Sequence, residues 1–232
     1  MQPKCELGTD CSDCGGTPTR LTAEYARDRP FTTLRGLGVD FFVRRSRTEP
    51  PFLLAVTDPA ADVDVSRVFR DSGVVEKGES LVAHKVFSQC CRRQNGSPGL
   101  FVDVGANFGA WPRDVPRRHG SCHRPFISSA GYYAMMAAAH GCRVEAFEPV
   151  PTNFAFLRYN VELNGFQDRV RIHQLAISDA PGSVKIKYIK PGAKARDGTP
   201  LNWGAASVFS PLAASEGDLE TIEVPAKCVR CR

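Results

Sequence analysis

Long apolar runs are missing from this chain of 232 residues, and no segment approaches the roughly 18 consecutive apolar residues of a membrane span. Residues 1–6 also lack the apolar centre of a signal peptide, which predicts a soluble protein, cytoplasmic by default. Internal repeats are absent as well. The length is sufficient for one α/β domain with a substantial core.

A strong excess of either charge is lacking. The formal net charge is +5, and residues 110–131 contribute +3 of it through four arginines against Asp114. The remaining +2 gives no reason to expect nucleic acid or an anionic membrane surface as a partner.

The most informative segment that is present spans residues 101–109 (FVDVGANFG). Its apolar beginning is typical of a buried parallel strand, with Asp103 near the carboxyl end. Gly105 follows directly, and a glycine turn lets the backbone approach a ligand closely. Because ligands of open α/β sheets bind at the carboxyl ends of the strands, this segment predicts a ligand-binding turn.

A nucleotide-type site needs a second acidic residue at the end of the next strand, where it accepts hydrogen bonds from ribose hydroxyls. The next apolar run, residues 143–147, is followed by Glu148 and closed by Pro149. Asp103 and Glu148 are 45 residues apart, although the usual separation is about 20. The position of Glu148 at the end of a strand therefore fits such a site, but its separation from Asp103 in sequence does not.

Residues 110–131 (AWPRDVPRRHGSCHRPFISSAG) explain the excess. They contain three prolines and four arginines and have no helical or strand periodicity. Beyond them, residues 132–140 form a strong helix that ends before Gly141. Without these 22 residues the separation between Asp103 and Glu148 falls to 23. We therefore interpret 110–131 as an unstructured insertion that separates the turn from its helix.

With the insertion set aside, three segments resemble the FkbM family of S-adenosylmethionine-dependent methyltransferases: VDVGANFG at 102–109, YYAMMAAAHGCRVEAFEP at 132–149 and NFAFLRYNVELNG at 153–165. The resemblance implies an α/β fold, a Rossmann-like class I methyltransferase sheet that is incomplete. We expect the first half of the parallel sheet plus a strand or hairpin. Strands at 101–104, 143–147 and 170–177 should lie in the order third-second-first, joined by right-handed crossovers through helices at 132–140 and 153–164.

The resemblance also implies S-adenosylmethionine as the cofactor. The residues that match the family's cofactor site are Asp103, Gly105, Asn107 and Gly109 at the methionine end, Glu148 at the ribose, and 175–177, which includes Ala176, along the adenine.

The implied reaction is methyl transfer to a hydroxyl oxygen of a sugar or small metabolite, so the expected partner is a small-molecule or glycan acceptor. Most of the barrier reduction comes from holding the nucleophile, methyl group and sulfur in line, and a base would add to it. The sequence identifies no such base. His173 and His140 are the nearest by residue type, and a strand-face and a helix-end position are the simpler interpretations.

Two alternatives remain open. Family members continue past a segment like 223–225 into a threonine-leucine-aspartate stretch, whereas this sequence ends at Arg232, so the chain could be a non-catalytic remnant of a truncated or mis-spliced reading frame. A nicotinamide-dinucleotide-binding Rossmann protein is the other alternative, although the spacing of Gly105 and Gly109 differs from its G-x-G-x-x-G fingerprint.

The flanking segments are less specific. Residues 1–30 read as a disordered, cysteine-containing segment before a single partial methyltransferase domain at 31–232, in which 193–218 is a long loop. Residues 41–43 and 52–56 are short candidate strands. Residues 79–92 predict an amphipathic helix. The side chains that this helix could bury are Leu81, Val82, Val86, Phe87 and Cys90.

The nine cysteines permit several readings. Cys11 and Cys14 with Cys228 and Cys231 could form a zinc site, but the two pairs lie at opposite ends of the chain, so we assign no metal. The amino-terminal cysteines could instead form disulfides in an oxidising compartment. The adjacent pair at 90–91 is read as helix packing rather than redox chemistry.

Overall fold

The computed structural model describes only part of the chain. The described residues are 34, 40–60, 62, 65–92, 96–105, 131–178, 180–190, 192–194, 198, 201, 206–207 and 215–228. Residues 1–30 and all of the interpreted insertion except Gly131 lie outside this set.

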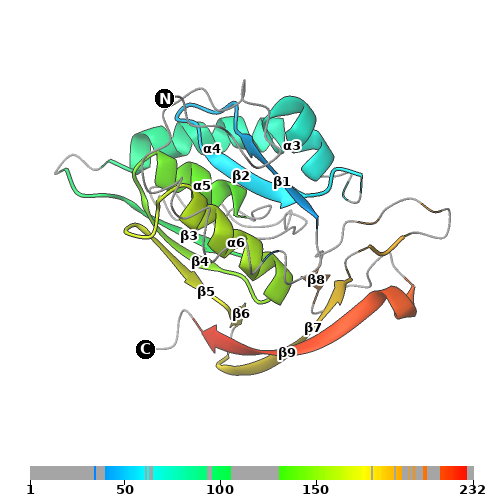
Figure 1. The fold of residues 1–232 in the computed structure, drawn as a ribbon. Helices are drawn as coiled ribbons and strands as arrows, with labels where there is room; N and C mark the ends of the chain where they lie inside the picture. Colours follow the sequence, from blue (N-terminus) through cyan, green and yellow to red (C-terminus); the bar gives the residue numbers. More distant parts are fainter. Residues whose placement is uncertain are drawn as a thin grey trace.

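A three-stranded parallel sheet forms the centre of the α/β fold (Figure 1). Its strands are β3 (Leu100–Val104), β4 (Arg143–Phe147) and β5 (Val170–His173). The observed order is β3-β4-β5, with Phe101 opposite Val144 and Val144 opposite Val170. The predicted order and parallel direction of the three strands are therefore confirmed.

Two helices connect these strands, close to their predicted bounds. Helix α5 (Tyr132–Ala139) precedes β4, and α6 (Pro151–Leu163) lies between β4 and β5. Each residue of α5 from 132 to 138 is buried. A helix that is apolar on all sides is a core element, and α5 packs between the sheet and the preceding helix α4 (Lys77–Cys90).

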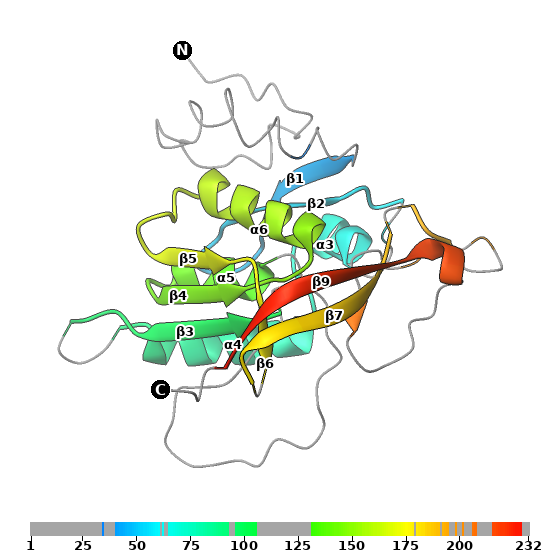
Figure 2. The same cartoon turned by 90° about the horizontal axis from the view of Figure 1, so that it is seen from below.

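One face of the sheet is buried more deeply than the other. Phe101, Val144, Ala146 and Val170 point into the cluster formed with α5, whereas Val102 and Glu145 on the opposite face are partly exposed. This alternation follows from the two-residue period of a strand. Figures 1 and 2 show α4 and α5 on the same side of the sheet.

Helix α4 exists where an amphipathic helix is predicted, but its buried face is different. Leu81 is 65% exposed and Val82 is 50% exposed, so their predicted burial is wrong. The buried residues are Ser80, Ala83 and Phe87. These three residues lie on one helical face, which packs into the core with α5, and Leu81 and Val82 lie on the face that points to solvent.

The third strand is shorter than predicted. It ends at His173, and Ala176–Ser178 form a separate strand, β6, in a second sheet of order β6-β9-β7-β8. Strand β9 (Leu219–Cys228) pairs with β6 in parallel and with β7 (Gly182–Ile189) in the antiparallel sense. The predicted single strand at 170–177 is therefore wrong in its second half. The competing partner, β9, lies about 50 residues away in sequence.

The region predicted as a loop at 193–218 also contains regular structure. It holds β8 (Ala206–Ser207) and a short 3₁₀ helix (Glu216–Asp218). Near the amino terminus, β1 (Phe41–Arg45) pairs with β2 (Leu53–Thr57), and α3 (Ser66–Ser72) follows.

Two asparagines attach β2 to α6. The amide of Asn160 accepts from Ala55 N at 2.6 Å and donates to Ala55 O at 3.1 Å. Asn164 makes the same pair of hydrogen bonds with Leu53, each at 2.7 Å. β2 pairs with β1, and these side chains bind further backbone groups of β2, which gives two asparagines of the NVELNG segment a structural role.

Candidate functional site

The carboxyl ends of the parallel strands are in register, so the residues that follow them share one edge. Gly105 N donates to Phe147 O at 2.8 Å, and Glu148 N donates to His173 O at 3.0 Å. The sequence-predicted turn and the sequence-predicted acid are thereby brought to the same end of the sheet. This is the end at which open α/β sheets bind ligands.

Two carboxylates are buried at this edge. Asp103 has no exposed surface, and Glu148 is 2% exposed. Moving a carboxylate out of water is costly, and buried acids concentrate at functional sites more than elsewhere. Glu148 Oε1 accepts a hydrogen bond from Val150 N at 2.7 Å, which fixes the carboxylate just before α6. A carboxylate has about four acceptor positions, so a side chain of this kind can accept several hydrogen bonds at once.

The glycine turn has the backbone conformation that the sequence predicts. Gly105 has a φ of 71°, a left-handed conformation that glycine adopts without strain. On the far side of the insertion, Gly131 precedes α5 with a φ of 77°. A Cβ at Gly131 would lie 2.5 Å from Leu157 Cδ1, so a side chain there would have to displace Leu157 and would also strain the left-handed backbone. Asn107 and Gly109 lie outside the described residues.

A polar pair that sequence reasoning missed lies at the same edge. Because Cys91 at the end of α4 is bonded to Cys142 just before β4, the beginning of α4 lies towards the carboxyl ends of the strands. There Tyr133 Oη donates to Glu76 Oε2 at 2.9 Å. Glu76 has a left-handed φ of 45°, which is rare for a residue with a side chain. No sequence signal identifies Glu76, because this conformation is imposed by its position between α3 and α4.

Partial desolvation affects the chemistry of this pair. It raises the pKa of Glu76 above its usual range, although the residue as a whole is exposed and the hydrogen bond from Tyr133 acts in the opposite direction. Burial, followed by the nearby Glu76 charge, raises the pKa of Tyr133. Tyr133 is therefore a neutral donor at physiological pH, and Glu76 is its acceptor.

The predicted adenine-binding segment, residues 175–177, does not belong to the parallel sheet of β3, β4 and β5. Ala176 lies in β6, where it pairs with Ala226 of β9, rather than at the end of β5. Leu175, between the two strands, is 8% exposed. The segment 175–177 thus follows the carboxyl end of β5 as a crossing between the two sheets.

The two histidines considered as bases occupy ordinary structural positions. His173 is the last residue of β5, and its Nε2 lies 2.7 Å from Glu145 Oε2 on the partly exposed face of the sheet. Its ring stacks on Phe147 with centroids 4.7 Å apart. His140 caps the carboxyl end of α5, at the opposite end of the sheet from Gly105 and Glu148. The strand-face and helix-end interpretations both match these positions.

Within the described ranges, no group of three or more histidine, cysteine or acidic side chains is arranged to hold a metal ion. No helix in this part of the chain is long and apolar enough to cross a membrane. Comparisons with protein-family models, curated proteins and solved structures find no match to this chain.

Proposed function

We propose that this chain has the cofactor-binding half of an S-adenosylmethionine-dependent methyltransferase, with Rossmann-like topology, acting on a hydroxyl of a sugar or small metabolite. The main observation in support of the proposal is that the residues after β3 and β4 lie at the same edge of the parallel sheet. A left-handed glycine turn after β3 and a buried glutamate after β4 lie in adjacent register positions, joined by the hydrogen bonds of the ladder. The resemblance of residues 102–109, 132–149 and 153–165 to the FkbM family supports the choice of cofactor.

The residues at this edge suit the chemical groups of that cofactor. Glu148 supplies acceptor oxygens for two ribose hydroxyls, and the hydrogen bond from Val150 holds its carboxylate in place. The Gly105 turn permits close approach of the methionine end. S-adenosylmethionine, when bound, would supply an electrophilic methyl group on a sulfonium sulfur. The protein's contribution would be orientation and exclusion of water, which account for most of the catalysis in such transfers.

Titration calorimetry with S-adenosylmethionine and with a nicotinamide dinucleotide tests the proposal, using the full chain and a variant that lacks residues 110–131. We expect the methyl donor to bind the deletion variant and to bind the full chain poorly or not at all, and we expect the dinucleotide to bind neither. In the deletion background, Glu148→Gln should weaken binding by about 1.5–3 kcal/mol, the value of a hydrogen bond to a charged group.

Glutamine retains an acceptor oxygen for Val150, so this variant removes the charge and keeps the local fold. Glu79→Gln, an exposed substitution on α4, is the matched control and should leave affinity unchanged. Unchanged affinity in Glu148→Gln would refute the assignment of Glu148. Binding of neither ligand by either chain would support the non-catalytic remnant instead.

A further inference from the structure

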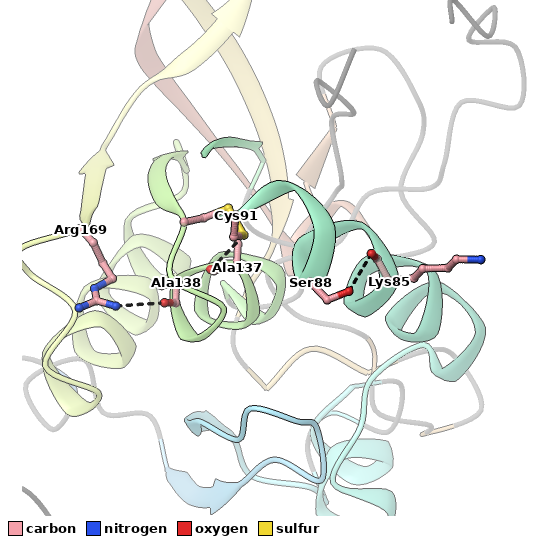
Figure 3. The surroundings of a disulfide bond; sticks show 7 residues. Lys85, Ser88, Cys91, Ala137, Ala138 and Arg169 are labelled. Carbon is pink, nitrogen blue, oxygen red and sulfur yellow. Dashed lines mark hydrogen bonds between the residues drawn. A yellow bond between two sulfur atoms is a disulfide. The ribbon is translucent and has the colours of Figure 1, made fainter. Parts of the chain in front are cut away.

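A buried disulfide joins α4 to the turn between α5 and β4. Cys91, the residue after α4, is bonded to Cys142, three residues after α5, and their Cα atoms are 4.4 Å apart. Figure 3 shows the surroundings of the disulfide, with Cys91 labelled. Cys91 has no exposed surface and Cys142 is 3% exposed. Cys90 is disulfide-bonded as well, so the interpretation of residues 90–91 as simple helix packing is wrong for both cysteines.

The disulfide closes a long loop that contains both the predicted glycine turn and α5. Its 51-residue separation contains β3, the Gly105 turn, residues 106–130 and α5. Residues 106–130 lie between the Gly105 turn and α5 in sequence, and the Cys91–Cys142 bond ties α5 to α4 independently of them. Packing and this cross-link together place α5 against α4.

Noncovalent polar contacts secure the beginning of α5 better than its end. At the beginning, Tyr133 donates to Glu76 at 2.9 Å, and Ser80 Oγ donates to Tyr132 Oη at 3.1 Å. At the end, the long contact from Arg169 Nη1 to Ala138 O is 3.5 Å (Figure 3).

Cys91 adds no hydrogen bond there. Its Sγ lies 3.6 Å from Ala137 O, but a disulfide sulfur carries no hydrogen, so this is a van der Waals contact while the bond is intact. The covalent bond is consequently the firmest link between α4 and the end of α5.

We propose that the Cys91–Cys142 disulfide is a structural staple that fixes α5 against α4, and that its reduction loosens α5 and, with it, the proposed cofactor edge. The second part rests on the proposed function; the first does not. Disulfides of this kind persist in oxidising compartments. The staple therefore favours such a compartment over the cytoplasmic location expected from the sequence.

Reduction of the staple is a simple thiol–disulfide exchange. A dithiol reductant attacks one sulfur as a thiolate, the S–S bond breaks, and the reductant's second thiol closes its own disulfide. Two electrons and two protons end on Cys91 and Cys142 as thiols. Because both sulfurs are buried, exchange requires α4 and α5 to separate first, so reduction of the folded protein should be slow.

Hydrogen–deuterium exchange of the full chain tests the staple. The chain is purified without reductant, and mass spectrometry of a nonreduced digest should show Cys91 and Cys142 in one cross-linked peptide. Exchange is then followed before and after reduction. Amides of α5 should exchange roughly a hundredfold faster in the reduced chain, within the range expected for a loop-closing disulfide.

The double variant Cys91→Ala/Cys142→Ala separates this bond from other cysteines. In the variant, α5 should already exchange fast, and reductant should change it little further. Absence of the cross-linked peptide would overturn the proposal. Equal α5 exchange in the oxidised and reduced native chain would do the same.

Affinity for S-adenosylmethionine, measured on the same two redox states of the full chain, tests the consequence for the site. We expect reduction to weaken binding severalfold, in keeping with a looser α5. Equal affinity in the two states would overturn the link to the cofactor edge. If neither redox state of the full chain nor the variant that lacks residues 110–131 binds the cofactor, the proposed function fails, while the exchange data still decide whether the staple exists.

Discussion

The ionisable side chains at the two ends of the parallel sheet differ in type and in burial, since the two acids are buried and His140 is half-buried. At the carboxyl end, Asp103 and Glu148 are acidic and adjacent to the glycine turn. At the amino end, His140 is surrounded by His84, whose ring centroid is 5.0 Å away, and Phe87. Its Nε2 is buried and forms no hydrogen bond within the described residues. Only the carboxyl end therefore combines buried charge with a backbone that a ligand can approach.

The environment of His140 predicts an acid-sensitive fold. Burial, and then the neighbouring His84, lower the pKa of His140 from 6.5 to about 4. The unfolded chain binds the proton more tightly than the folded chain, so stability is fully present above pH 6.5 and is lost as the pH falls towards 4. After allowance for solvent screening, the loss should be on the order of 1–2 kcal/mol.

Urea unfolding between pH 8 and pH 4 measures this contribution. His140→Phe keeps an aromatic ring beside Phe87 and cannot be protonated, so its stability should fall less steeply below pH 6.5 than that of the native chain. The difference between the two curves cancels the titration of the carboxylates. Parallel curves for the two proteins would show that His140 is not the responsible group.

At the level of elements, the sequence pattern predicted those helices and strands that neighbouring residues determine. The apolar run at 101–104 became β3, and the alanine- and methionine-rich stretch became α5, within one or two residues. The predictions failed where a segment that is distant in sequence determines the local structure. The segment at 176–178 leaves the first sheet because β9 offers a partner, and Leu81 faces solvent because the core packs against the face of α4 that carries Ser80, Ala83 and Phe87. Neither partner can be identified from a window of neighbouring residues.

The contact between α6 and β2 is a further case of a distant partner. Asn160 is fully buried, and its amide satisfies both backbone groups of Ala55. Asn160→Ala leaves a buried N–H and a buried C=O without these bonds, so we expect a loss of about 2–4 kcal/mol in the free energy of unfolding.

Denaturant titration of Asn160→Ala and of Arg158→Ala provides the comparison. Arg158 lies on the same helix and makes an exposed pair with Glu162, which should contribute less than about 0.5 kcal/mol. Similar losses in the two variants would mean that the asparagine does not anchor β2. Asn164, with its matching bonds to Leu53, extends the test to the end of α6.

For the whole molecule, the central question is how two halves of one proposed site are held together across residues 110–131. The Gly105 turn belongs to β3, whereas Gly131 begins α5 and packs against Leu157 of α6. The first turn of α5 offers backbone N–H groups and the positive end of the helix dipole, which suit a ligand carboxylate. Because residues 110–131 separate the two in sequence, their alignment depends on packing, and we expect the full chain to bind S-adenosylmethionine poorly or not at all.

Deletion of residues 110–131 should therefore strengthen binding. In the shortened chain Gly109 directly precedes Tyr132 and takes the position of Gly131, where the left-handed φ and the approach of Leu157 both favour glycine. The site would then be held by a short connection, with less chain entropy to lose on binding.

Calorimetry of the full chain and the deletion variant measures the gain in affinity, and a Gly109→Ala version of the deletion variant is the control. That substitution should remove much of the gain, since alanine is strained at a φ near 77°. If the full chain binds as tightly as the deletion variant, residues 110–131 are a tolerated part of the protein and the interpretation as an insertion that weakens the site is wrong.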